Sequence, residues 1–363
     1  MLSLLFYIFI GLAVLQFLYW IGIYLRIALS KPVEKSPKRI PVSVILYVKN
    51  QMDEIVDVLP KILGQQYHDF EVVIVNNAST DETLDICKEF ASLYPNIRIV
   101  DVVNNEAFWG SKRYALTLGI KASRHEYLLF ADCNTPIHSE HWLWQMSAQF
   151  TLNKTIVLGH TKYKKSKGIF NKWIRFEHTF TQMQSFAFSK WVTPYQLVAK
   201  NIGYKKEEFY KVSGFIDHMN EAQNEHELIL TKIASTKNVA VCDQSQATLT
   251  ISTPSNRKEW KVEKKRQLKL LKRMSFGAKF LHTFHHLIRL ALIPSAIVLL
   301  CWLYQPIIVG AVWVFLFLMR WIIFSMALNK FNQKDIKVWY PLFEIFTIFN
   351  LIRWLPTYFS KSK

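Results

Sequence analysis

Polar side chains follow directly after two apolar segments of the chain. They are Asn77, Ser79 and Asp81 after residues 70–75, and Asp132 and Asn134 after residues 127–131. Carboxylate and amide groups at the carboxyl ends of strands lie where open α/β sheets bind their ligands. The same residue types also form turns and helix N-caps, so each group alone leaves that interpretation open. Their occurrence after two strands of one sheet favours a site for a polar ligand.

Strand and helix patterns alternate through the first half of the region 41–280. Apolar, β-branched runs predict strands, and the stretches between them carry apolar residues at helical spacing. The predicted strands are residues 42–48, 70–75, 97–103 and 127–131, and the predicted helices are residues 53–63, 83–93 and 111–122. This alternation predicts an α/β fold, with a mostly parallel sheet and flanking helices on both faces. Such a sheet brings both polar groups to one edge.

Three apolar segments have the length of membrane spans. They are residues 2–25, 287–303 and 307–328, and about 17 to 25 helical residues cross the hydrocarbon core. The first has no basic start and is too long for the apolar core of a cleaved signal peptide, which favours an anchor. A fourth apolar stretch, 338–359, is interrupted by prolines and polar residues, which favours helices that lie in the membrane interface.

Basic residues are concentrated beside these segments. The chain has 45 Lys and Arg against 27 Asp and Glu, a formal net charge of +18. Basic flanks stay in the cytoplasm, and here they occur at 26–39, 257–279 and 330–337. The region between the spans is therefore expected in the cytoplasm, at the inner (plasma) membrane. This placement of charge suits lipid headgroups better than a nucleic-acid groove, so no nucleic-acid partner is expected.

The predicted organisation has four parts. They are a transmembrane anchor at 1–25, a basic linker at 26–40, a cytoplasmic domain at 41–280 and a C-terminal membrane region at 281–363 with two spans and interfacial helices. The four cysteines, Cys87, Cys133, Cys242 and Cys301, include no Cys-x-x-Cys pair. A disulfide framework or zinc site is therefore not expected, and reduced cytosolic thiols fit better.

A series of motifs occurs in a fixed order between Pro41 and Lys269. They are Pro41-Val-Ser-Val-Ile, Phe70-Glu-Val-Val-Ile-Val-Asn-Asn-Ala-Ser-Thr-Asp, Gly110-Ser-Lys-Arg-Tyr-Ala-Leu, Asp132-Cys-Asn, Asn201-Ile-Gly-Tyr-Lys-Lys, Phe209-Tyr-Lys-Val-Ser-Gly-Phe, Asn224-Glu-His-Glu-Leu and the stretch from Trp260 to Gln267. Each match alone is weak, but the ordered set resembles the family 2 glycosyltransferases. The resemblance implies the GT-A nucleotide-diphospho-sugar transferase fold, and the three apolar segments outside its range add N-terminal and C-terminal transmembrane helices.

The resemblance also implies a reaction. The chain would move a sugar, with inversion, from a nucleotide-sugar donor to a lipid-linked or envelope glycan acceptor at the membrane. Glu225 aligns with the general base that accepts the proton of the attacking hydroxyl, and Glu227 is the second candidate. Asp132 and Asn134 fall on the Asp-x-Asp motif, which binds a divalent cation (Mg²⁺ or Mn²⁺) and the donor diphosphate.

The resemblance to the family also predicts further residues that contact the donor. Asn77, Ser79 and Asp81 are expected to hold the nucleoside. Lys112 and Arg266 are expected to offset the charge of the phosphates, Arg266 through a bidentate guanidinium. An alternative for Arg266 is a membrane-surface cation within a basic stretch.

The chain departs from the family pattern at several of these positions. Asn77 and Asn134 stand where the family has Asp, and Glu225 also replaces an Asp. Glu263 and Gln267 stand where the family has Gln and Trp. Each Asp-to-Asn change removes a charge that would help hold a cation. Three interpretations remain: a weaker metal site, a site completed by other carboxylates, or a catalytically degenerate membrane subunit that acts as a partner protein.

Overall fold

The chain forms two compact units in a computed structural model. The described residues are 1–30, 39–103, 111–192, 194, 200–216, 225–271 and 273–359. One unit, here called the helical unit, consists of Met1–Lys31, Ser166–Thr193 and Leu271–Lys363, and the other, the sheet unit, of Pro32–Lys165 and Pro194–Leu270. Residues 31–38 of the predicted linker, Gly110 and Asn224 lie outside the described residues.

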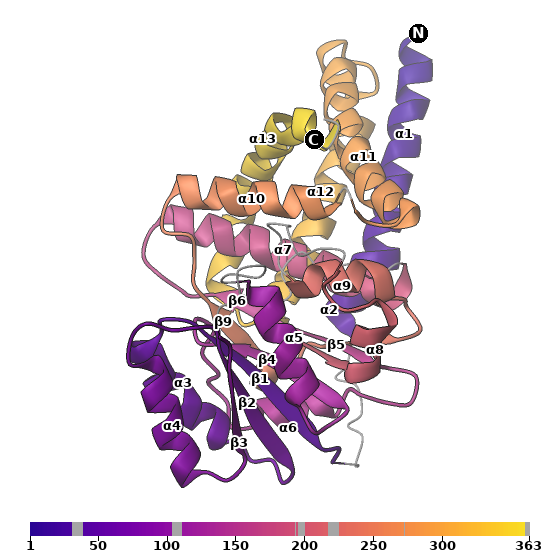
Figure 1. Cartoon of the computed structure of the whole chain (residues 1–363). Coiled ribbons are helices and arrows are strands. Elements are labelled where there is room, and N and C mark those ends of the chain that lie inside the picture. Colours follow the sequence, from indigo (N-terminus) through magenta and orange to yellow (C-terminus); the bar gives the residue numbers. More distant parts are fainter. Residues whose placement is uncertain are drawn as a thin grey trace. The chain divides into compact units, whose positions relative to one another are not determined.

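A seven-stranded sheet forms the centre of the sheet unit, as far as its residues are described (Figure 1). Its order is β3-β2-β1-β4-β7-β5-β8. The strands are β1 (Val42–Val48), β2 (Phe70–Asn76), β3 (Ile97–Asp101), β4 (Tyr127–Asp132), β5 (Ile156–Gly159), β7 (Ile202–Lys205) and β8 (Val239–Cys242). The first four run parallel, whereas β7 is antiparallel to both of its neighbours, β4 and β5. The predicted mostly parallel α/β sheet is confirmed. A further parallel pair joins β6 (Thr161–Tyr163) to β9 (Leu249–Ile251).

Successive side chains of β1 point into two different layers, as the pleat of a strand requires. Val44 and Leu46 belong to the core that includes α3 (Met52–Leu63) and α6 (Trp142–Ser147). Ile45 lies on the other face, against α5 (Lys112–Ala122). A Cβ at Gly119 of α5 would stand 2.3 Å from Val75 Cγ2, so only glycine permits this close approach. Tyr47 has the register of Ile45 and therefore faces the α5 layer.

The three helices between the first four strands form where the sequence predicts them. Along α3 the buried residues recur at helical spacing, as Ile55, Val58, Leu59 and Ile62, and α4 (Thr83–Leu93) packs on α3 and β3. Ser111 begins α5 as its N-cap, because its hydroxyl accepts a hydrogen bond from the Tyr114 backbone N–H at 3.4 Å. Lys112 is thereby fixed as the first residue of that helix. The remaining helices of this unit are α8 (Lys206–Lys211), α9 (Glu225–Ile233) and α10 (Arg257–Leu271).

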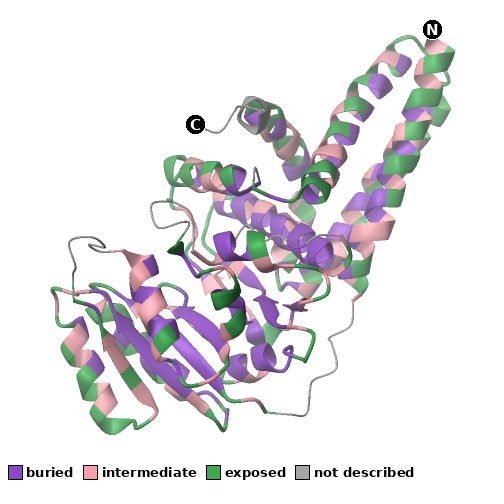
Figure 2. Cartoon of the chain, turned by 45° about the vertical axis from the view of Figure 1, so that its right-hand side comes forward, coloured by how far each residue is buried: buried purple, intermediate pink, exposed green. Residues whose placement is uncertain are grey.

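The helical unit contains three helices, among the described residues, that are long and apolar enough to cross a membrane: Leu2–Leu29, Phe276–Cys301 and Pro306–Lys330. The first is a continuous helix of α1 (Leu2–Tyr19), a π-helical turn (Trp20–Leu25) and α2 (Arg26–Leu29), and the others are α11 and α12. Apolar side chains such as Leu4 and Leu18 are exposed on α1, in contrast to the buried strands of the sheet (Figure 2). An exposed apolar surface of this extent indicates association with a membrane.

Buried ion pairs join other helices of this unit. Arg289 of α11 donates to Glu344 of α13 (Tyr340–Phe359) at 2.8 Å. Arg175, on α7 (Ile169–Trp191), donates to Asp335 at 2.9 Å and 2.8 Å. The helix α7 therefore packs with the apolar helices, although the sequence assigned all of 41–280 to one domain. Buried aromatic residues of α7 take part in this packing, since the Phe176 ring lies 4.8 Å from that of Phe324 and the Phe186 ring 6.1 Å from that of Phe331.

Candidate active site

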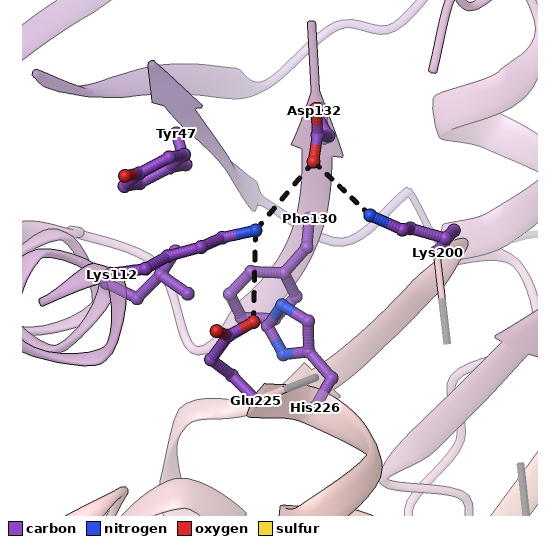
Figure 3. Close-up of a pocket in the computed structure, with 9 residues that line it drawn as sticks. Tyr47, Lys112, Phe130, Asp132, Lys200, Glu225 and His226 are labelled. Carbon is purple, nitrogen blue, oxygen red and sulfur yellow. Dashed lines mark ion pairs between the residues drawn. The ribbon is translucent and has the colours of Figure 1, made fainter. Parts of the chain in front are cut away.

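The carboxyl ends of β1, β2 and β4 meet at one edge of the sheet, because these strands are parallel neighbours. A cavity of about 30 Å³ lies there. Its lining combines two carboxylates and two ammonium groups with aromatic and apolar side chains, namely Tyr47, Lys112, Leu116, Phe130, Ala131, Asp132, Lys200, Glu225 and His226 (Figure 3). The topology thus brings together residues that are far apart in the sequence.

Asp132 is the last residue of β4 and carries two ammonium partners. Its Oδ2 lies 3.6 Å from Lys200 Nζ and 3.8 Å from Lys112 Nζ, and its Oδ1 accepts a hydrogen bond from the Asn134 backbone N–H at 3.0 Å. Burial alone would raise the pKa of Asp132, but Lys200, Lys112 and the bonds from Asn134 outweigh it and lower that pKa. Asp132 is therefore ionised at neutral pH.

Glu225 begins α9 and faces the same cavity. Its Oε2 lies 3.8 Å from Lys112 Nζ, and the Glu225 side chain is 13% exposed. The ammonium of Lys112 therefore stands between Glu225 and Asp132 (Figure 3), and it also lies 4.9 Å from the centre of the Tyr47 ring. A carboxylate in a small, partly closed cavity has the access that a proton acceptor needs.

His226 follows Glu225 and packs its ring 4.2 Å from the ring of Phe130. The pKa of His226 is lowered to about 3. Burial is the largest cause, Lys112 and Lys200 also lower the pKa, and Asp132 opposes them with a smaller effect. The imidazole is therefore neutral at physiological pH. It forms an apolar wall of the cavity and adds no charge to it.

Glu227, the second candidate for the base, lies in a different environment. Its carboxylate is fully buried and contacts Arg266 Nη1 of α10 at 2.7 Å. Arg266 also contacts Glu263 at 2.5 Å and 2.9 Å. Burial would lower the pKa of Arg266, but Glu227 and Glu263 outweigh that effect and raise it. Glu227 does not line the small cavity.

A second cavity of about 530 Å³ adjoins this ion-paired cluster. It is lined by Asn134, Thr135, Tyr163, Lys200, Ile251, Ser252, Thr253, Pro254, Glu259, Val262, Glu263 and Arg266. Lys200 belongs to both cavities. Asn134 and Arg266 lie along this larger space, and their contact with the donor phosphates stays a prediction.

The predicted nucleoside residues lie in the loop after β2 and bind other loops. Asn77 Nδ2 donates to the Tyr47 hydroxyl at 2.9 Å. Ser79 Oγ accepts from the Asn50 backbone N–H at 3.0 Å, and Asp81 accepts from the Thr83 backbone N–H at 3.1 Å. None of the three lines either cavity. They fix the loops at the sheet edge, and their contact with a nucleoside remains a prediction.

Besides the apolar lining, the sequence prediction missed three polar lining residues: Tyr47, Lys200 and His226. Tyr47 belongs to a strand that the sequence predicted. It lies two residues after Ile45, so both side chains point to the same face of the sheet. Lys200 immediately precedes the motif Asn201-Ile-Gly-Tyr, and a basic residue at that point was the available signal. Its contact with Asp132 depends on β7 pairing with β4, which no local pattern indicates.

The residues around Asp132 do not fit a divalent cation. Both Asp132 oxygens are engaged, one by two ammonium groups and one by a backbone N–H. Lysine offers no acceptor to a metal, and Mg²⁺ and similar cations select oxygen ligands. Within the described part of the chain, no three His, Cys, Asp or Glu side chains gather closely enough to hold a metal ion.

Comparison with known proteins identifies the class to which this fold and site belong. The family model for glycosyl transferase family 2 matches residues 43–219. A mannosyltransferase structure, PcManGT from Pyrobaculum calidifontis in complex with GDP-Man and Mn²⁺, shares the fold with a TM-score of 0.56 and 16% identity, over 95% of this chain and 96% of that one. Residues 43–219 belong to glycosyl transferase family 2, and the predicted GT-A fold and enzyme class are confirmed.

The names of two relatives in sequence refer to polymers. The poly(ribitol-phosphate) beta-glucosyltransferase of Bacillus spizizenii is 28% identical over 130 residues, 35% of this chain and 20% of that protein. The poly-beta-1,6-N-acetyl-D-glucosamine synthase of Staphylococcus epidermidis is 27% identical over 166 residues, 43% of this chain and 39% of that protein. The matches thus span less than half the length of either relative.

Proposed function

We propose that this chain transfers a sugar from a nucleoside diphosphate sugar to an acceptor hydroxyl, with inversion at the sugar carbon. The observation that carries this proposal is the meeting of Asp132 and Glu225 in one cavity, with the Lys112 ammonium between them. Membership of family 2 supports the donor class. The cavity at the carboxyl ends of parallel strands is also the expected ligand position in this kind of sheet.

In the proposed reaction Glu225 acts as the general base. The acceptor hydroxyl loses its proton to the Glu225 carboxylate as its oxygen bonds to the anomeric carbon. The bond from that carbon to the diphosphate oxygen breaks, and the nucleoside diphosphate leaves with the electron pair. Direct attack from the opposite side inverts the anomeric centre and needs no covalent enzyme intermediate.

The contrast with Glu227 supports this assignment of the base. Glu225 is accessible from a cavity, whereas the Glu227 carboxylate is fully buried and ion-paired at 2.7 Å. A base must come within hydrogen-bond reach of the hydroxyl it deprotonates. Glu227 would first have to leave Arg266, which makes it the weaker candidate.

We further propose that the acceptor is a lipid-linked or envelope glycan at the cytoplasmic face of the membrane. The apolar helices support a membrane location. The basic flanks support a cytoplasmic sheet unit by the positive-inside rule. The names of the two sequence relatives, which refer to a poly(ribitol-phosphate) and to a polymer of N-acetyl-D-glucosamine, support an envelope acceptor.

A divalent cation at Asp132 and Asn134 stays a prediction from the family resemblance. The P. calidifontis mannosyltransferase structure contains Mn²⁺, which supports it by analogy. The two lysines at Asp132 count against it, and the reaction above routes no step through a metal.

The test is sugar release and transfer by the purified full chain in detergent or nanodiscs. A panel of radiolabelled uridine and guanosine diphosphate sugars is incubated with a membrane lipid extract as acceptor source, with and without Mn²⁺. We expect hydrolysis or transfer with at least one donor. A cooperative thermal transition shows that the protein is folded. Folded protein that turns over no donor contradicts the proposal and favours a partner subunit without catalytic activity.

A further inference from the structure

We propose that the ammonium groups of Lys112 and Lys200 together take the role of the divalent cation, so that this chain binds its donor diphosphate and transfers sugar without a metal. The inference rests on the proposed function and assigns to Lys200 a direct contact with the leaving group. The geometry that carries it is the pair of ammonium groups on a single carboxylate oxygen, Asp132 Oδ2, at 3.6 Å and 3.8 Å.

The two lysines approach this oxygen from different elements. Lys112 begins α5, whose position is fixed by the Ser111 cap and the contact of Gly119 with β2. Lys200 lies just before β7, which pairs with β4. The Asp132 carboxylate points between them (Figure 3). An anion held by two ammonium groups from separate parts of the sheet unit marks a binding position for anionic oxygens.

The charges at the cavity leave little place for a metal. The described lining contains two carboxylates, Asp132 and Glu225, and two ammonium groups, so their formal charges cancel. A divalent cation bound to Asp132 would stand close to both ammonium groups and be repelled by them. A diphosphate that enters the same space is repelled by the Asp132 and Glu225 carboxylates but attracted by both ammonium groups, which turn from the carboxylates to the phosphate oxygens. Partial burial strengthens each interaction, because the local dielectric is lower than that of water.

The position of Lys200 suits a contact with the leaving group. Its side chain is 36% exposed, and that of Lys112 is 33% exposed, so both can exchange a carboxylate for a phosphate. Lys200 also lines the 530 Å³ cavity, from which a donor can reach it. An ammonium carries three N–H donors and no acceptor. It can therefore stabilise the charge that develops on the diphosphate as the bond to the sugar breaks, with no proton transfer.

The inference is tested with the full chain in excess EDTA, by turnover of the active donor and by calorimetric binding of UDP and GDP. We expect turnover in EDTA to stay within about twofold of that with Mn²⁺, since no metal supplies the charge stabilisation. Lys200→Met is expected to weaken nucleotide binding in EDTA about tenfold, because one charged hydrogen-bond donor is lost. It should lower kcat about 10²-fold, and Lys200→Arg should restore part of both.

Lys205→Met is the matched control. Lys205 lies five residues further along the chain, at the end of β7, with its ammonium 5.3 Å from the centre of the Tyr127 ring, and it lines neither cavity. Its variant should bind nucleotide and turn over like the wild type. Thermal transitions of all variants show that they are folded.

Two results would overturn the inference. One is turnover that EDTA abolishes and Mn²⁺ restores, which would leave the proposed sugar transfer standing. The other is a folded Lys200→Met protein that binds nucleotide in EDTA as tightly as the wild type. If the wild type turns over no donor at all, the proposed function fails. Nucleotide binding in EDTA then tests separately whether Lys112 and Lys200 bind a diphosphate without a metal.

Discussion

Two carboxylate–cation clusters lie at the two ends of one short segment of α9, and they differ in tightness. The first, here the cavity cluster, consists of Asp132, Glu225, Lys112 and Lys200, with contacts of 3.6–3.8 Å. The second, the buried cluster, consists of Arg266, Glu227 and Glu263, with contacts of 2.5–2.9 Å. Lysine is a flexible point charge, whereas the planar guanidinium matches carboxylates in a fixed geometry.

The difference indicates that the cavity cluster serves ligand binding and that the buried cluster stabilises the fold. Long contacts around a cavity leave the lysines free to turn to an incoming anion. Short contacts around the buried Glu227 carboxylate tie α9 to α10, although Arg266 and Glu263 also line the 530 Å³ cavity. Glu225 and Glu227 are two residues apart, yet they belong to different clusters. Position in a motif alone does not distinguish them, but burial and partner do.

Among the substitutions of cations, the largest expected effect is that of Lys112→Met on catalysis. One ammonium contacts both Asp132 and Glu225, so its loss removes a cation from the whole cavity cluster. We expect kcat/KM for the active donor to fall about 10³-fold. Lys121→Met, on the exposed side of the same helix, is the control and should change little. If the folded Lys112→Met variant has wild-type kinetics, the cavity cluster does not serve catalysis and the contrast with the buried cluster fails.

Arg266→Met should act on stability. Removing the guanidinium takes the Arg266 partner from the buried Glu227 carboxylate, which costs about 3 kcal/mol. The Tm of the full chain in detergent should therefore fall by several degrees. If Tm stays constant and nucleotide affinity drops instead, Arg266 contacts the phosphates, as the sequence resemblance implies, and the buried cluster is not structural.

His226, between the two glutamates, should make stability depend on pH. Its pKa is about 3 in the folded chain against 6.5 for a free histidine, so the unfolded state binds the extra proton between these values. The free energy of unfolding therefore falls as pH drops below 6.5, by about 1 kcal/mol per pH unit. His226→Phe removes this component. We expect its Tm to fall less than that of the wild type between pH 7 and pH 5, and equal slopes would contradict a neutral, buried His226.

The smallest effect is expected for Glu263→Gln. The Glu263 side chain is 28% exposed, and Arg266 keeps its contact with Glu227 in the variant. A partly exposed pair contributes about 1 kcal/mol or less. Tm should therefore fall by a small fraction of the change in Arg266→Met. Equal losses in the two variants would mean that Glu263, and not Glu227, is the main partner of Arg266.

The local pattern of the sequence sufficed for much of the fold. The strands 42–48 and 70–75 and the helix 83–93 were predicted nearly to the residue, because apolar alternation and helical spacing are local signals. The same parallel strands explain why Asp132 was expected at the ligand edge. The three apolar helices also form as predicted, although the first extends to Leu29 and α11 begins at Phe276.

Contacts between distant elements could not be predicted. Lys200 meets Asp132 only because β7 inserts antiparallel beside β4. Arg266 was expected at phosphates, but its partners Glu227 and Glu263 depend on how α10 packs on α9. The helix α7 packs on α12 through Phe176 and Phe324, and the apolar pattern of a helix does not show which other helices it will contact.

The most direct measurement is the kcat of Glu225→Gln and Glu227→Gln with the same donor, corrected for the folded fraction. We predict that Glu225→Gln keeps its Tm and loses about 10²- to 10⁴-fold in kcat, as expected when a general base is removed. Glu227→Gln should lower Tm but keep the kcat of the folded molecules within about tenfold, because its carboxylate takes no part in proton transfer. The opposite pattern, an active Glu225→Gln beside an inactive but folded Glu227→Gln, would contradict the assignment of the cavity cluster as the catalytic centre.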